Sequence, residues 1–357
     1  MSQTARRRSR AGELEDLTQV FDQSPALVHP LADESLAERR RFARELSDIV
    51  AAQVAPPIDP TVTIAGEQIA GLPIRSYTPG GWDTNTGPLL VFLHGGGFVF
   101  GEPHELINDS LLSNRARSTG VRILSLGYSL APEFPFPAAR DEATRVWLAL
   151  RAAHPAVRMG LGGVSAGAAI SISTVLELTA SGAPLPDYLL LEVPPAGPDP
   201  VPAEQDLAGA DPHPGVREQW AIYPLALAAY RGRPGDRLLS SDSPDPLRLP
   251  PTLILMAEHD ALRPGAEALA ARLHAAGTAV TSQVISDTIH GSIGATRRCQ
   301  AAREWEAVVA GWLAQPSGPD RAPSESAPGV SPSSEPGGLA PFAPGALPPS
   351  EGEHHAA

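Results

Sequence analysis

The sequence of 357 residues contains no lysine, because all 27 of its basic side chains are arginine. This absence excludes a P-loop, which holds phosphates with a lysine, and Schiff-base chemistry, which needs a lysine amine. The single cysteine, Cys299, cannot form a disulfide within the chain, and no group of cysteine and histidine has zinc-site spacing. We therefore expect neither a structural metal nor a cofactor.

Long apolar runs and an excess of positive charge are also missing. No stretch reaches the roughly eighteen apolar residues of a membrane helix, and the basic residues Arg6–Arg10 lead into acidic ones rather than a secretory apolar segment. The formal net charge of -13 opposes binding to nucleic-acid phosphates. We expect a cytoplasmic globular protein that acts on a small molecule, with a homodimer as an open alternative to a monomer.

The chain divides into three parts. Residues 1–59 predict an amphipathic helical cap segment lying on a larger domain, with apolar residues at helical intervals at Leu36, Phe42, Leu46, Ile49 and Val50. Residues 60–314 alternate β-rich runs with helical stretches, which indicates an α/β catalytic domain. Residues 315–357 are rich in proline, glycine and serine, and predict a disordered tail.

The pattern within residues 60–314 predicts an open, mostly parallel sheet covered by helices. Two runs, Leu89–Leu93 and Thr252–Met256, are apolar on both faces, as central strands of such a sheet must be. The expected strands are Thr61–Ile64, Leu72–Thr78, Leu89–Leu93, Val121–Gly127, Arg158–Gly163, Tyr188–Val193, Thr252–Ala257 and Val280–Ile285. The expected helices are Ala138–Ala153, Ala166–Thr179, Arg217–Arg231, Ala266–Ala275 and Gly294–Ala314.

The segment Gly163–Gly167 reads G-x-S-x-G and lies between an expected strand and an expected helix. In that context the motif forms a tight turn that lifts the serine hydroxyl above the sheet edge, and only small flanking residues fit. Ser165 is thus the candidate nucleophile. A plain strand-to-helix turn is the alternative, because a lone G-x-S-x-G arises easily in a chain rich in glycine and alanine.

A glycine-rich segment, His94–Phe98, directly follows the apolar run Leu89–Leu93. Acyl transfer builds negative charge on a carbonyl oxygen, and glycines let backbone N–H groups approach that oxygen closely. We expect the donors to be Gly95, Gly96 and Ala166, aided by the positive end of the helix after Ser165. A phosphate-binding loop is the competing reading, but the lysine that such a loop uses is absent.

A serine nucleophile needs a base, and the chain has ten histidines. His290 follows the last expected strand and comes late in the chain, where this order of residues places the base. His94 is expected to brace the glycine segment, whereas His104 and His259 stay open as weaker candidates. The others fall in the tail, ahead of the core, in a proline-rich insertion or at helix ends: His354, His355, His29, His213, His154 and His274.

The acid that would orient this base is expected at the end of another strand. Asp260 follows Thr252–Ala257, so it would emerge at the carboxyl edge, where open α/β sheets collect their sites. It would fix the tautomer of His290 and stabilise the imidazolium. Asp287 and Glu258 are the nearest competitors, and a helix cap is the alternative role for Asp260. The ordered set of strand-end residues favours the catalytic reading.

Taken together, these segments resemble the hormone-sensitive-lipase-like branch of the α/β-hydrolases over roughly residues 72–314. The resemblance rests on His94–Phe98, Tyr128–Ala139, the Ser165 turn, Pro250–Asp260 and Ile289–Gly291. It implies an α/β-hydrolase fold with an eight-stranded sheet, a helical cap from the N-terminal segment, and hydrolysis of carboxylic esters by a Ser165–Asp260–His290 triad without a metal.

The chain departs from the pattern of this branch at three positions. Val164 and Ala168 stand where the branch usually has aspartate and glycine, and Ser292 stands where an aromatic residue usually follows His-Gly. We expect Ser292 to leave more room or polarity beside His290. The acidic, proline-rich stretch Pro194–Pro214 is expected either near the substrate pocket, with helix Arg217–Arg231, or as a surface insertion.

The function expected from these residues is that of a serine hydrolase that cleaves small carboxylic esters through an acyl-enzyme. An acetyl hydrolase or amidase acting on an acylated small molecule is the close rival, because the same triad cleaves both kinds of bond. A ligand receptor on a hydrolase scaffold is the rival from another class. The presence of Asp260 and His290 speaks against that receptor, since relatives that became receptors have lost the histidine.

Overall fold

The computed structural model describes residues 35–196, 226–231 and 247–314. One sheet of eight strands runs in the order β1-β2-β4-β3-β5-β6-β7-β8; β2 is antiparallel to β1 and β4, and every other pair is parallel. The mostly parallel sheet expected from the sequence is therefore confirmed. The strands are β1 (Val62–Ile69), β2 (Leu72–Pro79), β3 (Leu89–Leu93), β4 (Arg122–Leu126), β5 (Met159–Val164), β6 (Tyr188–Glu192), β7 (Thr252–His259) and β8 (Val280–Ile289).

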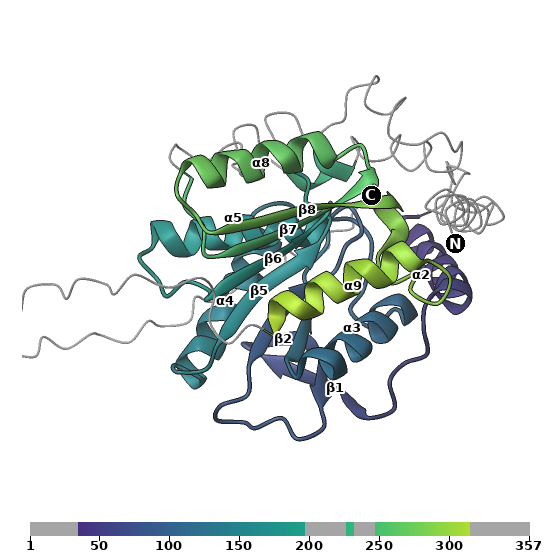
Figure 1. Ribbon diagram of the computed structural model, residues 1–357, viewed down its shortest axis with the longest axis horizontal. Helices are drawn as coiled ribbons and strands as arrows, with labels where there is room; N and C mark the ends of the chain where they lie inside the picture. Colours follow the sequence, from purple (N-terminus) through teal and green to yellow (C-terminus); the bar gives the residue numbers. More distant parts are fainter. Residues whose placement is uncertain (1–34, 197–225, 232–246, 315–357) are drawn as a thin grey trace, which may run out of the picture. The chain divides into compact units, whose positions relative to one another are not determined.

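Helices cover both faces of this sheet. They are α2 (Leu36–Val54), α3 (Leu106–Thr119), α4 (Ala138–Ala153), α5 (Ala166–Ala180), α8 (Arg263–Ala275) and α9 (Gln300–Leu313). Figure 1 shows α3 and α9 on one face of the sheet and α4, α5 and α8 on the other, while α2 packs against α3. Because both faces are covered, every residue of β3 and residues 252–257 of β7 are buried, as the two apolar runs indicate.

The helix α3 was not expected from the sequence. Its buried residues include Asn108, Asp109, Ser113 and Arg115 beside two leucines, so no apolar stripe at helical spacing marks it. Its end does carry a signal, because Gly120 adopts the left-handed conformation (φ 69°) typical of a helix C-cap. Hydrogen bonds and ion pairs of its polar side chains, together with the buried Leu111, Leu112 and Ala116, hold this helix against the sheet.

Of the expected elements, β1 and the last helix differ most from their expected bounds. β1 continues to Ile69 rather than Ile64, because Ala70 and Gly71, both with positive φ, form a tight turn that pairs the whole strand with β2. The last helix begins at Gln300 rather than Gly294, because residues 294–299 form turns instead. Differences of this kind arise from pairing and turns that a local pattern does not show.

Several expectations concern residues that the structure does not describe. The expected tail 315–357, residues 197–214 of the acidic proline-rich stretch and residues 217–225 of the helix after it lie outside the described residues. Residues 226–231 are helical, as expected. Among the residues described, no helix is long and apolar enough to cross a membrane.

The helix α2 begins with a capping box, in which Ser35 and Glu38 satisfy each other's backbone N–H groups. Its apolar face is narrower than expected: Leu46, Val50 and Val54 are buried, but Ile49 is 57% exposed. The buried apolar residues of α2 thus lie in its C-terminal half. Three of its polar side chains, Arg44, Ser47 and Asp48, bond to Glu102, Glu105 and the N–H of Leu106 at the start of α3.

Glu105, the residue just before α3, is buried in that interface. Its carboxylate accepts hydrogen bonds from the Ser47 hydroxyl (2.9 Å) and the Glu102 N–H (3.1 Å). Burial, together with the nearby carboxylates of Asp48 and Glu102, raises the pKa of Glu105 to about 7. The native protein therefore holds a proton there that an unfolded chain would release at lower pH.

A buried ion network joins α3, β6 and α9. Arg115 donates to both carboxylate oxygens of Glu192 (2.8 and 3.0 Å) and to both of Glu306 (3.0 and 2.7 Å). Trp305 donates to Glu192 as well (2.7 Å), and the side chains of Arg115 and Glu192 are completely buried. The charges of Arg115 and Glu192 depend on their partners, because both side chains are shut off from solvent, whereas Glu306 is 21% exposed.

Replacing Arg115 with methionine is expected to lower the free energy of unfolding by about 3–5 kcal/mol, because Glu192 would keep a buried charge without its cation. Arg117→Met is the matched control, since Arg117 is 55% exposed and its ion pair should contribute at most about 1 kcal/mol. Urea unfolding of both variants measures the difference. Equal losses in the two variants would contradict the role given to the network.

Glu105→Gln is expected to flatten the dependence of stability on pH. Since the pKa of Glu105 is raised from 4.5 to about 7, its contribution is fully present below pH 4.5 and is lost as the pH rises through 7. Between about pH 4.5 and pH 8 the wild type should therefore lose up to roughly 3 kcal/mol relative to the variant. Urea unfolding at both pH values measures this, with Glu45→Gln on exposed α2 surface as control; parallel curves for wild type and Glu105→Gln would refute it.

Candidate active site

Ser165 occupies the turn between β5 and α5 in a strained backbone conformation (φ 53°, ψ −121°). Its N–H donates to the carbonyl of Glu192 at the end of β6 (2.9 Å). A Cβ on Gly163 would lie 2.5 Å from the carbonyl oxygen of Leu93, and one on Gly167 would collide with the same oxygen. The glycines of the motif are therefore required by the close approach of β3 to this turn.

The structure brings the hydroxyl of Ser165 to His290. The distance from Ser165 Oγ to His290 Nε2 is 3.0 Å, and His290 Nδ1 lies 2.8 Å from Asp260 Oδ2. A carboxylate only accepts, so it selects the tautomer in which Nδ1 carries the proton and Nε2 accepts from the serine. This arrangement can draw the proton from the serine as its oxygen attacks a carbonyl.

Asp260 is held for this contact by its position after β7. Its side chain is 1% exposed, and Oδ1 accepts the N–H of Leu262 (2.9 Å), which leaves Oδ2 for His290. The competing acids are turned elsewhere: Glu258 accepts the N–H of Asp287 (2.7 Å), and Asp287 itself adopts a positive φ of 59°. The structure therefore brings Asp260, and not its two competitors, to the histidine.

The weaker histidine candidates do not reach the serine in these contacts. His104 Nε2 lies 2.8 Å from a carboxylate oxygen of Glu102, and His259 Nε2 lies 3.9 Å from one of Glu258. Both rings are about one third exposed or more. Each has a surface carboxylate as its partner, so neither needs a catalytic role.

The glycine segment lies beside the nucleophile. A Cβ on Gly95 would touch the Val164 carbonyl (3.4 Å) and the Ser165 Cβ (3.6 Å), so the backbone of Gly95 passes directly over the turn. Gly96 has a φ of 122°, and its carbonyl accepts the N–H groups of Val99 (3.2 Å) and Phe100 (2.9 Å). These bonds fold residues 96–100 into a compact turn.

Ala166, the third expected donor, is the first residue of α5 and is 1% exposed. The first N–H groups of a helix have no partner within it, and they carry its positive end. The N–H of Ala166 is thus at the helix end nearest to Ser165. Gly95, which passes over this turn, and Ala166, which follows Ser165 in the chain, therefore both lie beside Ser165.

His94 contacts this segment as expected from the sequence, and the structure adds which atoms it contacts. Its Nδ1 lies 2.8 Å from the carbonyl of Gly95, and its ring stacks on Tyr128 with 4.2 Å between centroids. Burial lowers the pKa of His94 to about 4, so the ring is neutral near pH 7 and donates from Nδ1. Tyr128, to which sequence reasoning gave no chemistry, also donates to the His94 carbonyl (2.9 Å).

Glu192 is a second residue that sequence reasoning missed. Its carbonyl holds the N–H of Ser165, and its carboxylate is locked by the network under the site. A signal was available, because a charged residue at the end of the buried run Tyr188–Val193 must be paired. The sequence could not reveal that the partner is Arg115.

Ser292 is buried in the turn that carries the histidine. It is 1% exposed, and its hydroxyl accepts the N–H of Ile289 (2.9 Å). This bond closes the 3-10 turn His290–Ser292. The hydroxyl therefore supports the backbone of this turn, and more room or polarity beside His290 stays a prediction.

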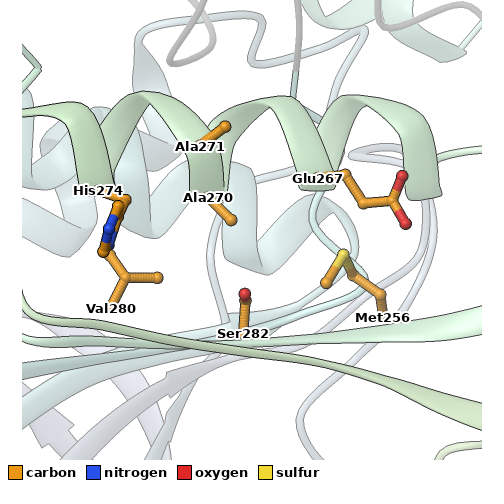
Figure 2. Close-up of a pocket in the computed structure, with 7 residues that line it drawn as sticks. All are labelled: Met256, Glu267, Ala270, Ala271, His274, Val280 and Ser282. Carbon is orange, nitrogen blue, oxygen red and sulfur yellow. The ribbon is translucent and has the colours of Figure 1, made fainter.

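A separate pocket of about 300 Å³ lies between α8 and the strands β7 and β8. It is lined by Met256, Glu267, Ala270, Ala271, His274, Val280 and Ser282. Figure 2 shows these side chains between the helix and the sheet, with Ser282 directed toward α8. No expected site residue lines it. Across the described ranges, no three His, Cys, Asp or Glu side chains are placed to hold a metal ion.

Comparison with known proteins adds independent findings. A family model described as alpha/beta hydrolase fold matches residues 90–294. Ethyl acetate hydrolase of Pseudomonas putida is 28% identical over 75% of this chain and 86% of its own length. Against three other curated relatives, which are 32%, 35% and 33% identical, the chain spans only 18%, 43% and 60% of their lengths.

Two solved structures share the fold. Ester-hydrolase EH1AB1 from the metagenome of Lake Arreo, complexed with a derivative of bipyridine phosphonate, has a TM-score of 0.72 and 27% identity, covering 85% of this chain and 97% of that one. An esterase from the bacterial hormone-sensitive lipase family has a TM-score of 0.69 and 26% identity, with the same coverage. The likeness thus extends over most of this chain and nearly the whole of each solved structure.

Gly96→Ala is expected to cost about 3 kcal/mol or more of unfolding free energy, because the new Cβ would collide with the Phe100 carbonyl at a φ that alanine disfavours. Gly71→Ala is the control, since Gly71 also has a positive φ (76°) but no atom lies within 4 Å of its Cβ position. It should cost only about 1–2 kcal/mol. Urea unfolding decides, and similar losses would show that the turn is not close-packed.

Proposed function

The chain belongs to the α/β-hydrolase fold family, and on that premise we propose that it is a serine carboxylesterase that cleaves esters of small molecules through an acyl-enzyme. The observation that carries the proposal is the pair of hydrogen bonds joining Ser165 to His290 (3.0 Å) and His290 to Asp260 (2.8 Å). These are the contacts that nucleophile, base and orienting acid need.

In the first half of the reaction, Ser165 Oγ attacks the ester carbonyl while His290 Nε2 takes its proton. Asp260 accepts from Nδ1 and stabilises the imidazolium that results. The negative charge on the carbonyl oxygen is met by the N–H groups of Gly95, Gly96 and Ala166 and by the positive end of α5. Collapse of this tetrahedral intermediate breaks the ester bond, and His290 returns the proton to the departing alcohol.

In the second half, water replaces the alcohol. His290 takes a proton from water as its oxygen attacks the acyl carbon, and the same three N–H groups bind the second oxyanion. When this intermediate collapses, Ser165 regains its proton and the carboxylic acid leaves. The cycle balances without an oxidant, reductant or cofactor, because hydrolysis consumes only water.

The substrate class is supported by chemistry and by likeness. The relative of Pseudomonas putida is named for ethyl acetate, and a similar solved structure is titled an ester-hydrolase, which favours a short acyl ester over an amide. An amide would need the same proton relay but has a poorer leaving group. Parallel assays with p-nitrophenyl acetate, longer acyl esters and N-acetyl amides rank the three classes directly.

Ser165→Ala is expected to abolish hydrolysis of p-nitrophenyl acetate and labelling by a fluorophosphonate probe, while the fold stays intact. Removing the nucleophile of such a triad costs about 10⁶ in kcat. Ser181→Ala is the matched control, since Ser181 is exposed at the far end of the same helix. Wild-type protein that neither hydrolyses esters nor takes up the probe would instead favour a ligand receptor on this scaffold.

A further inference from the structure

Arg40 on α2 makes an unusual set of contacts with the loops beside the candidate site. Its Nε donates to the carbonyl of Val99 (2.8 Å) and its Nη2 to the carbonyl of Ala131 (2.8 Å). Both terminal nitrogens also donate to the two carboxylate oxygens of Glu133, each at 2.7 Å. One guanidinium thus joins a helix to two loops that are 59 and 91 residues away in sequence.

The first of these acceptors belongs to the turn that contains Gly96. The N–H of Val99 donates to the Gly96 carbonyl, and the Val99 carbonyl accepts from Arg40, so the same residue links the cation to the glycine. A shift of Val99 would move Gly96 with it. In the proposed function, the N–H of Gly96 is one of the three that donate to the oxyanion.

The second acceptor, the carbonyl of Ala131, belongs to a residue that is itself bonded to the turn. The N–H of Ala131 donates to the carbonyl of Phe98 (3.0 Å), next to Val99 in the same turn. Arg40 therefore bonds the turn directly at Val99 and indirectly at Phe98 through Ala131. Glu133, two residues beyond Ala131, fixes the plane of the guanidinium, and the hydrogen bond from Arg40 lowers the pKa of that carboxyl.

The turn needs such support because it is strained. Gly96, Gly97 and Phe98 have φ values of 122°, 59° and 68°, so three consecutive residues of the turn lie in regions that most side chains avoid. Conformations of this kind persist only where the surroundings hold them. The ring of Phe98 stacks on Tyr230 with 4.0 Å between centroids, but this contact holds the side chain and not the peptide groups.

We propose that Arg40 is a positioning residue that holds the turn of residues 96–100 so that the N–H of Gly96 points at the oxyanion of the ester. This role rests on the proposed function of the site. Arg40 touches neither substrate nor Ser165 in this assignment; it acts through the Val99 and Ala131 carbonyls. The planar fork of arginine suits it, because one rigid group bonds two carbonyls and a carboxylate, which the point charge of lysine cannot do.

Arg40→Met is expected to lower kcat for p-nitrophenyl acetate by about 10- to 100-fold and to leave KM within about twofold. Loss of an oxyanion donor costs about 10²–10³ in kcat, and a misplaced donor should cost less. Arg40→Lys should lie between Arg40→Met and the wild type, because an ammonium can bond one of the two carbonyls. A purely structural role would change the fraction of folded protein but not kcat per folded molecule.

Arg41→Ala is the matched control. Arg41 lies on the same helix, is 71% exposed and pairs only loosely with Glu45 at 3.7 Å, so its removal changes the net charge equally without touching the turn. It should leave kcat and KM unchanged. Equal losses of kcat in the Arg40 and Arg41 variants, or an unchanged kcat in folded Arg40→Met, would overturn the proposal.

Hydrogen–deuterium exchange separates this proposal from the proposed function. The peptide covering residues 95–101 should exchange faster in Arg40→Met and in Arg40→Lys, and at the wild-type rate in Arg41→Ala. Unchanged exchange in folded Arg40→Lys and Arg40→Met would overturn the positioning role even if the wild type is an active esterase. A further outcome is faster exchange in the Arg40 variants while the wild type shows no esterase activity. That result would mean that Arg40 holds the turn and that the proposed function has failed.

Discussion

The site depends on one close contact between backbones, in which the carbonyl oxygen of Leu93, at the end of β3, approaches Gly163 and Gly167 in the turn around Ser165. No side chain fits between this oxygen and the turn, since a Cβ on Gly163 or Gly167 would meet it. The close approach sets the strained turn that presents Ser165. It also fixes where the segment after Leu93 begins, so the backbone of Gly95 passes beside the nucleophile. Ser165 and Gly95, to which we assign the roles of nucleophile and oxyanion donor, are therefore adjacent because two backbones touch.

The second constraint is the charge buried behind this contact. Glu192 supplies the carbonyl that accepts the N–H of Ser165, and its carboxylate is completely buried with Arg115. An ion pair without water contributes little net stability, but it tolerates only one geometry, because losing either partner leaves a bare charge. Two helices thus hold the end of β6. Arg115 on α3 and Trp305 on α9 both donate hydrogen bonds to the carboxylate of Glu192.

Most of the sheet could be predicted because its signals are local. The apolar runs Leu89–Leu93 and Thr252–Met256 must be buried on both faces, and glycines at residues 163 and 167 require a tight turn wherever they occur. Helix α3 could not be predicted, because many of its buried residues are polar and their partners lie on other elements. The hydrogen bond between Ser292 and the N–H of Ile289 could not be predicted either, because spacing alone does not reveal it.

The absence of lysine has a consequence for the frame of the site. Every side-chain cation apart from histidine is a guanidinium, which stays charged over the whole pH range in which proteins fold and bonds several acceptors at fixed angles. Arg40 and Arg115 join helices to the loop and strand ends around Ser165 in this way, so these contacts do not loosen by losing the charge of the cation. Acid sensitivity of the frame must therefore come from its carboxylates and from the buried ring of His94, whose pKa is lowered to about 4. Glu105 responds to pH in the opposite direction, because burial raises its pKa to about 7. It loses its proton, and the folded protein loses stability, as the pH rises through 7.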